Sequence, residues 1–269
     1  MIKNAWINIT DTCNSNCLWC YEKISVKKNK FMPESQIYEI FDLLNTIGVD
    51  RCILIGGEPT LHPKLPEIFE RGEAQGIRLY LISNGRKFFD KSFTNRMIKA
   101  GLKNQRITIS MHASSNEDSK KLTRAENHFR ELEQGIQNLI AEGIFPYINV
   151  TIAKPLLDVL ETMMYQVQSW GLKYIAFNQG APAVSQMGVD ASHTLHPMKL
   201  ASISKRLFDL GNKIGMKTAF LFNIPFCLLP KDTIDEMIEA SAIISGCQVK
   251  SKSGILFNVN GELVLVITY

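Results

Sequence analysis

Short apolar runs rich in branched residues alternate along this chain with longer amphipathic stretches. The runs at residues 5–10, 51–55, 77–82, 106–111, 147–152 and 174–177 predict buried strands. The stretches at 33–46, 64–75, 90–100, 129–142 and 156–170 predict helices, several of them closed by a glycine such as Gly48 or Gly143. The chain therefore repeats a unit of strand, loop and helix.

Six such units predict an α/β fold, a partial (β/α)6 TIM-like barrel with helices outside a parallel sheet. We expect the barrel to occupy residues 1–215, with active-site residues at the carboxyl ends of its strands. A helix at 197–214 and a strand at 217–222 follow, then a helix at 232–244 and two short strands around Asn260-Gly261, a dipeptide suited to a tight hairpin. Residues 216–269 are expected to form a small C-terminal α+β appendage.

Composition narrows the class of protein. The chain has 269 residues, 45% of them hydrophobic, which is enough for a substantial core. The formal charge of +4 comes from 30 basic and 26 acidic residues and gives no reason to expect a nucleic-acid partner. The first ten residues do not resemble a signal peptide, and no stretch of about 18 apolar residues occurs. We expect a cytoplasmic protein without a membrane partner.

Three of the six cysteines fall within one short segment. Cys13, Cys17 and Cys20 directly follow the first predicted strand, so one loop carries three thiols. Thiolates suit iron-sulfur clusters or zinc, and a four-iron cluster held by three cysteines leaves one iron open to another ligand. A zinc site with His62 or His112 as the fourth ligand is the alternative. It would make the chain a non-enzymatic zinc or electron-transfer protein.

A second motif occurs further along the chain, after the second predicted strand. The gaps of three and two residues, the aromatic Trp19 before Cys20, and Gly56-Gly57-Glu58-Pro59 after the second strand together resemble the radical S-adenosylmethionine (radical SAM) superfamily. The resemblance covers roughly residues 5–215. It implies a [4Fe-4S] cluster, S-adenosylmethionine, and a reductant such as flavodoxin or ferredoxin. In the family, reductive cleavage of S-adenosylmethionine gives a 5'-deoxyadenosyl radical that abstracts hydrogen from the substrate.

The same resemblance implies a set of cofactor-binding residues. The Gly-Gly-Glu-Pro turn would receive the amino group of S-adenosylmethionine, polar groups after the third and fourth strands would meet its ribose and carboxylate, and an arginine after the fourth strand would pair with the carboxylate. Several of these positions also suit ordinary turn or surface residues. The set is Tyr21, Gly56, Gly57, Glu58, Pro59, Ser83, Asn84, Ser110 and Arg124. No residue is assigned a catalytic role.

The C-terminal segment contains Cys227 and Cys247 and resembles the start of the SPASM/twitch modules that hold an auxiliary cluster. Val266 stands where that pattern has a cysteine. A second iron-sulfur cluster on Cys227 and Cys247 therefore competes with an interpretation as two plain thiols, whereas Cys52 is expected in the core. The segment favours a peptide substrate, as in the maturation of ribosomally made peptides. A small metabolite such as a nucleotide or sugar is the alternative.

Overall fold

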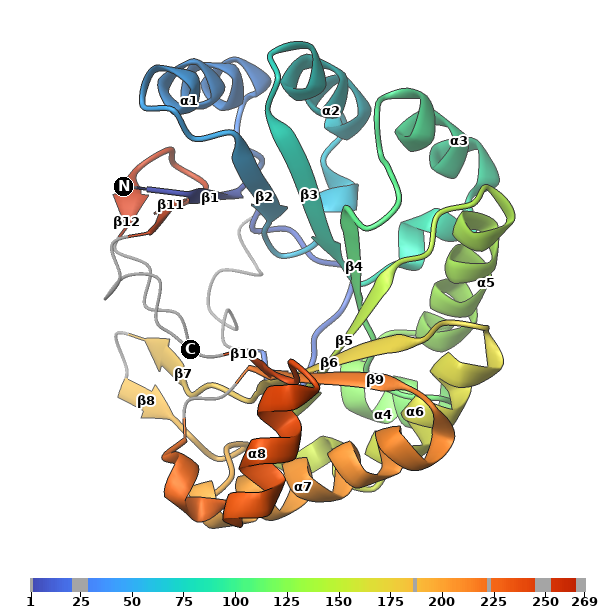
Figure 1. Cartoon of the computed structure of the whole chain (residues 1–269). Helices are drawn as coiled ribbons and strands as arrows, with labels where there is room; N and C mark the ends of the chain where they lie inside the picture. Colours follow the sequence, from blue (N-terminus) through green and yellow to red (C-terminus); the bar gives the residue numbers. More distant parts are fainter. Residues whose placement is uncertain (1, 21–28, 186–187, 222–223, 245–252, 265–269) are drawn as a thin grey trace.

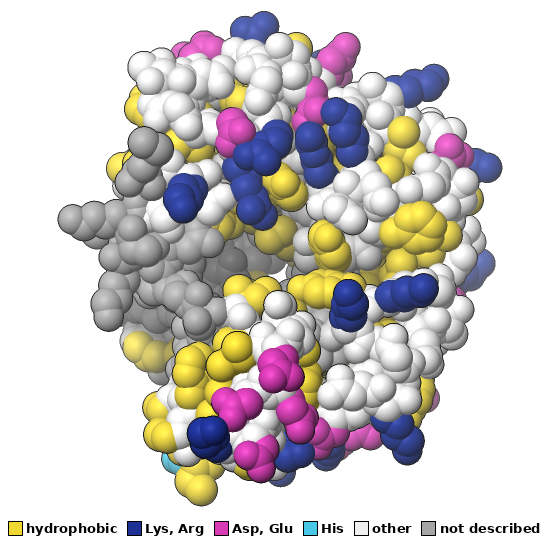
Figure 2. Space-filling model, in the orientation of Figure 1, with side chains coloured by type: hydrophobic (Ala, Val, Ile, Leu, Met, Phe, Trp, Pro, Cys, Tyr) yellow, Lys and Arg dark blue, Asp and Glu magenta, His cyan; other side chains and the backbone are white. Residues whose placement is uncertain are grey.

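The protein is a curved parallel sheet with helices on its outer side (Figure 1). This computed structural model describes residues 2–20, 29–185, 188–221, 224–244 and 253–264. Its main sheet has ten strands in the order β10-β9-β6-β5-β4-β3-β2-β1-β11-β12 and does not close on itself. Figure 2 shows a hollow at the centre of the same face. The predicted partial barrel is confirmed.

The central strands and the outer helices alternate along the chain as the hydrophobic pattern predicts. The strands are β1 (Asn4–Asn8), β2 (Arg51–Ile55), β3 (Arg78–Ser83), β4 (Ile107–Ser110), β5 (Tyr147–Ile152), β6 (Tyr174–Gln179) and β9 (Lys217–Leu221). The helices are α1 (Glu34–Thr46), α2 (Leu65–Ala74), α3 (Lys91–Lys99), α4 (Asn116–Thr123), α5 (His128–Ala141), α6 (Leu160–Ser169), α7 (Pro197–Ile214) and α8 (Lys231–Glu239). Among the described residues, no helix is long and apolar enough to cross a membrane.

The two faces of the sheet differ in burial. On β5, for example, Ile148, Val150 and Ile152 are at most 2% exposed and pack into the core under the helices. Their neighbours Asn149 and Thr151 are half-buried and lie on the inner face. Because side chains alternate along a strand, this pattern assigns every second residue of each strand to the inside of the barrel.

The segment after residue 215 adds strands to both edges of the sheet. β9 pairs in parallel with β6, and β10 (Ile243–Ile244) with β9. β11 (Gly254–Phe257) pairs in parallel with β1 and forms the predicted hairpin with β12 (Leu263–Val264) around Asn260-Gly261. The tail is thus joined to the first barrel strand. A domain boundary at residue 215 stays a prediction.

Candidate functional site

The three clustered cysteines lie on the loop that follows β1, at the carboxyl end of the barrel strands. Cys13, Cys17 and Cys20 are all half-buried. The loop is held against the end of α4, where Asn16 N donates to Thr123 O at 2.8 Å and Leu18 N to Leu122 O at 3.1 Å. The backbone that carries the thiols is therefore fixed by a neighbouring helix.

The electrostatics of these thiols fit a site for a cationic cluster. Burial, followed by the charge of Glu58, raises the pKa of Cys13 to about 12. Burial raises the pKa of Cys17 as well, and the neighbouring thiols raise it further. Thiolates crowded in this way are stabilised when a bound metal takes the place of their protons. The donor set matches the soft ligands that iron-sulfur clusters use.

Of the two histidines considered for a zinc site, His62 is not free to act as a fourth ligand, whereas the buried Nδ1 of His112 has no hydrogen-bond partner among the described residues. The Nε2 atom of His62 lies 2.8 Å from Met32 O, and its Nδ1 accepts a hydrogen bond from Lys64 N at 3.2 Å, so both ring nitrogens are occupied. The His112 ring contacts Trp19 edge-on at 5.0 Å and stacks on His128 at 5.9 Å. Within the described ranges, no three or more His, Cys, Asp or Glu side chains already form a metal site.

The Gly-Gly-Glu-Pro turn is interlocked with the cysteine loop. Gly57 N donates to Thr10 O at 2.7 Å and Glu58 N to Thr12 O at 2.8 Å. A Cβ atom on Gly57 would lie 2.5 Å from Thr12 O, and one on Gly56 would collide with Thr10 O. Both glycines are needed because the turn after β2 packs directly on the backbone after β1. Pro59 is buried and begins the short helix η1 (Pro59–Leu61).

The Glu58 side chain is turned into the protein. Its Oε1 accepts hydrogen bonds from Thr60 N at 3.0 Å, Thr60 Oγ1 at 2.6 Å and Ser83 Oγ at 2.8 Å, and its Oε2 accepts one from Asn84 N at 2.7 Å. Burial raises the pKa of this carboxyl group, and the four donors oppose that rise. The carboxylate thus ties the end of β3 to the turn after β2. Oxygens for a ligand ammonium would come from the backbone of the turn.

The end of β3 completes this network. Asn84 Nδ2 donates to Asn14 Oδ1 at 2.8 Å, which links the predicted Ser-Asn-Gly turn to the cysteine loop. Arg86 lies beyond the predicted set, and its guanidinium donates to Asn14 O and pairs with Glu131 at 2.6 Å. Sequence reasoning missed Arg86, although its place directly after Ser-Asn-Gly offered a signal.

Three predicted cofactor-binding residues remain to be placed. Arg124, exposed at the end of α4, lines a pocket of about 530 Å³ together with Cys13 and Arg86. Ser110 ends β4 on the inner face, opposite Asn149 in the sheet register. Tyr21 lies outside the described residues. The structure brings the other predicted residues to the carboxyl end of the sheet; their roles toward a cofactor stay predictions.

Of the predicted auxiliary pair, the described residues include Cys227. Cys227 is exposed in the short helix η4 (Phe226–Leu228), and Cys247 lies outside the described residues. Cys52 is fully buried on β2, as expected of a core residue. A second cluster stays a prediction.

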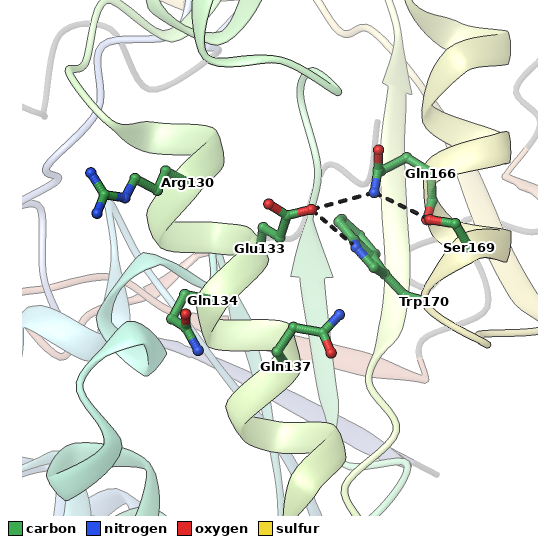
Figure 3. Close-up of a pocket in the computed structure, with 7 residues that line it drawn as sticks. All are labelled: Arg130, Glu133, Gln134, Gln137, Gln166, Ser169 and Trp170. Carbon is green, nitrogen blue, oxygen red and sulfur yellow. Dashed lines mark hydrogen bonds between the residues drawn. The ribbon is translucent and has the colours of Figure 1, made fainter.

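A second pocket lies away from the cysteine loop. It has a volume of about 550 Å³ and lies on the outer layer, between α5 and α6 (Figure 3). Glu133 Oε1 accepts hydrogen bonds there from Trp170 Nε1 at 3.3 Å and Gln166 Nε2 at 3.4 Å. The polar side chains bond to one another across the two helices and include none of the predicted site residues. We assign this groove to helix packing.

Comparison with known proteins identifies relatives among nucleotide-modifying enzymes. The chain is 31% identical over 278 residues to a probable GTP 3',8-cyclase of Saccharolobus islandicus, an alignment that covers 97% of this chain and 82% of that protein. It is 29% identical to a probable GTP 3',8-cyclase of Thermococcus kodakarensis over 58% of this chain and 50% of the relative. The chain spans about half the length of several curated relatives that it matches.

Two solved structures of similar fold contain a bound peptide. Streptococcus suis SuiB bound to its precursor peptide SuiA has a TM-score of 0.76 and 14% identity, covering 99% of this chain and 60% of SuiB. The protein anSMEcpe, with bound AdoMet and a Cp18Cys peptide, has a TM-score of 0.70 and 16% identity, covering all of this chain and 75% of that chain. At these identities the likeness establishes the fold.

A comparison with models of protein families agrees with three features of the structure. These are the cysteine loop, the Gly-Gly-Glu-Pro turn and the open parallel barrel. The model of the Radical SAM superfamily matches residues 7–156, which is more than half of the chain and includes both motifs. The protein belongs to the radical SAM superfamily.

Proposed function

We propose that this protein uses S-adenosylmethionine to abstract a hydrogen atom from a peptide. When bound, the family's [4Fe-4S] cluster supplies the electron that splits S-adenosylmethionine into methionine and a 5'-deoxyadenosyl radical. Cys13, Cys17 and Cys20 would hold that cluster. Backbone oxygens of the Gly56-Gly57 turn would receive the ammonium group, and Arg124 would pair with the carboxylate. The hydrogen-bonded loops around Glu58 would keep these groups in place while the substrate enters the barrel.

We choose a peptide as the substrate because the polar side chains on the inner face of the barrel, near the cofactor end, are uncharged. Beside the cofactor end, this face presents Ser110, Asn149, Thr151 and Asn178, which lie on β4, β5 and β6. The buried atom Asn178 Oδ1 has no hydrogen-bond partner in the described part of the chain. Buried acceptors without partners cost free energy until a donor reaches them, and peptide N–H groups are such donors.

A nucleoside triphosphate would require a different lining. Its phosphates need several Arg or Lys side chains, and the inner-face positions near the carboxyl ends of the described strands carry hydroxyl, amide and aliphatic groups instead. The charge pattern therefore favours an uncharged, hydrogen-bonding part of the substrate at the point of radical transfer, while Arg51 and Lys217 lie at the amino ends of β2 and β9.

Deuterium transfer tests this function without knowledge of the substrate. Cells of the organism that carries the gene are grown in deuterated medium, and their extract is divided into peptides of 1–10 kDa and molecules below 1 kDa. The reconstituted protein is then incubated with each fraction, unlabelled S-adenosylmethionine and dithionite. We expect deuterium in 5'-deoxyadenosine from the peptide fraction and its loss after protease treatment. Enrichment from the small-molecule fraction alone would contradict the proposal.

A nucleotide substrate is the second candidate. The match to a probable GTP 3',8-cyclase over 97% of this chain favours it. GTP deuterated on its ribose, given in the same assay, separates the two: deuterium in 5'-deoxyadenosine from this GTP would support the nucleotide.

A further inference from the structure

Arg86, just after β3, joins the cysteine loop to two other parts of the molecule. On one side its guanidinium donates to Asn14 O and, at 3.5 Å, to Ser15 Oγ of the cysteine loop. On the other side it donates to Glu126 O at 3.2 Å and pairs with the Glu131 carboxylate of α5 at 2.6 Å. The Arg86 side chain is only 11% exposed. Because a guanidinium carries its N–H donors in a rigid fork, it can hold several acceptors at fixed positions.

Close backbone packing places Arg86 in this position. Arg86 begins the short helix η2 (Arg86–Phe89), directly after Gly85. A Cβ atom on Gly135 of α5 would lie 2.6 Å from Gly85 O, so α5 and the start of η2 touch through their backbones. Glu131 precedes Gly135 by about one helical turn and therefore lies on the same face of α5. The contact between α5 and η2 thus sets the ion pair and leaves the rest of the guanidinium for the cysteine loop.

The contacts of Arg86 on this loop lie between two of the proposed cluster ligands. Asn14 and Ser15 directly follow Cys13 and precede Cys17. Burial dominates the raised pKa of the Cys13 thiol, whereas a backbone hydrogen bond from Ser15 and the charge of Arg86 both oppose that rise. Cys13 and Arg86 also line the same pocket of about 530 Å³. Arg86 is therefore close enough to Cys13 to stabilise negative charge on its sulfur.

We propose that Arg86 is a positioning residue for the iron-sulfur cluster: it holds the turn between Cys13 and Cys17, and its charge favours the reduced cluster. This inference rests on the cluster site of the proposed function and holds whichever substrate reacts. Reduction adds one electron to a cluster that thiolates already make negative, so a cation beside the ligands stabilises the reduced form. Removing the charge of Arg86 therefore lowers the reduction potential, and removing the charge of its partner Glu131 raises it.

A redox titration of the reconstituted protein without S-adenosylmethionine tests this effect. Dithionite supplies one electron to each cluster, and the reduced cluster is followed by its EPR signal. In Arg86→Gln we expect the equilibrium constant for reduction to fall about tenfold, which is about 59 mV for a one-electron couple. In Glu131→Gln we expect that constant to rise about threefold, because the arginine charge is left unpaired. An ion pair with a merely structural role would not shift the potential in opposite directions.

Further variants separate the charge of Arg86 from its shape. Arg86→Lys keeps the charge and loses the fork, so the reduction constant should change by less than about twofold, while iron release to a chelator should be about tenfold faster. Arg130→Gln removes an exposed cation next to Glu131 and should change neither quantity. The double variant Arg86→Gln and Glu131→Gln leaves no unpaired carboxylate, which covers the case in which Arg86→Gln does not fold. Its potential should lie below that of Glu131→Gln.

The outcomes distinguish this inference from the function on which it rests. A native chain that assembles no iron-sulfur cluster would overturn both. If the native chain holds its cluster, potentials that shift in the same direction in Arg86→Gln and Glu131→Gln, or in neither, would overturn the role of the charge and leave the radical function standing. Iron release from Arg86→Lys at the native rate would overturn the role of the fork in holding the turn.

Discussion

The two ends of the barrel are built in opposite ways. At the carboxyl end, loops after β1, β2 and β3 are tied by internal hydrogen bonds, and the Glu58 carboxylate alone accepts four. At the amino ends of β2 and β9, Arg51 and Lys217 are exposed and have no carboxylate partner among the described residues. One end is therefore organised before any ligand arrives, and these positions at the other end are open to solvent.

This difference matches two different tasks. A cofactor that is the same in every turnover binds more tightly to groups that are already fixed. The entropy of ordering those groups is lost when the protein folds and not when the cofactor binds. A substrate has to enter and leave, so its contacts are better placed on an open face. The comparison predicts that substitutions at the carboxyl end damage cofactor binding and stability, and that those at the amino end change stability little.

The largest effect is expected at the cysteine loop. Cys17→Ala removes one of the three thiols proposed to hold the cluster, and we expect at least a hundredfold loss of 5'-deoxyadenosine release together with loss of bound iron. Cys52→Ala is the matched control, since Cys52 is a fully buried core residue on β2. Iron is measured after anaerobic reconstitution. Equal iron in both variants would refute the assignment of Cys17 as a ligand.

The next effect concerns the buried carboxylate. Glu58→Gln loses charge-assisted hydrogen bonds and directs an amide N–H₂ group at other donors, so we expect the free energy of unfolding to fall by about 3 kcal/mol. Urea unfolding of the apoprotein measures it. The control Glu67→Gln alters an exposed residue of α2 that pairs with Lys64 at 3.5 Å, and it should cost less than about 0.5 kcal/mol. Similar losses in both variants would mean that the Glu58 network is not stabilising.

A smaller effect should appear with pH. Burial lowers the pKa of His128 to about 3, whereas the unfolded chain has an ordinary histidine value. The unfolded state therefore binds the proton more readily, and stability falls as the pH drops below about 6.5. We expect this residue to contribute about 2 kcal/mol of loss between pH 7 and pH 5.

A variant isolates the contribution of His128. In His128→Phe the fall in unfolding free energy between pH 7 and pH 5 should be smaller by that amount. An unchanged slope in His128→Phe would show that the residue is not protonated on unfolding in this range.

The smallest effect belongs to the amino end. Arg78 and Asp50 form an exposed ion pair at 2.8 Å, and the contact lowers the pKa of Asp50. Exposed pairs contribute little, so Arg78→Gln should cost less than about 1 kcal/mol in urea unfolding and leave 5'-deoxyadenosine release unchanged. A loss as large as that of Glu58→Gln would remove the contrast between the two ends.

Local periodicity predicted the barrel well, because each strand and helix has its own apolar pattern. Helix α4 (Asn116–Thr123) escaped prediction since its sequence is almost wholly polar and its burial depends on neighbours. The pairing of β11 with β1 escaped it as well, because register between segments 250 residues apart leaves no local signal.

For the site, the motifs located the loops and left the side-chain directions open. Glu58 was expected near a ligand, yet its carboxylate bonds to Thr60, Ser83 and Asn84. That orientation follows from tertiary contacts between two loops, which no spacing in the sequence expresses.

The most direct test of the account is 5'-deoxyadenosine release from the anaerobically reconstituted native chain with S-adenosylmethionine and dithionite, beside Cys13→Ala treated identically. The account predicts release from the native chain and none above background from the variant. Equal release from both, or none from a native chain that holds its full complement of iron, would contradict it.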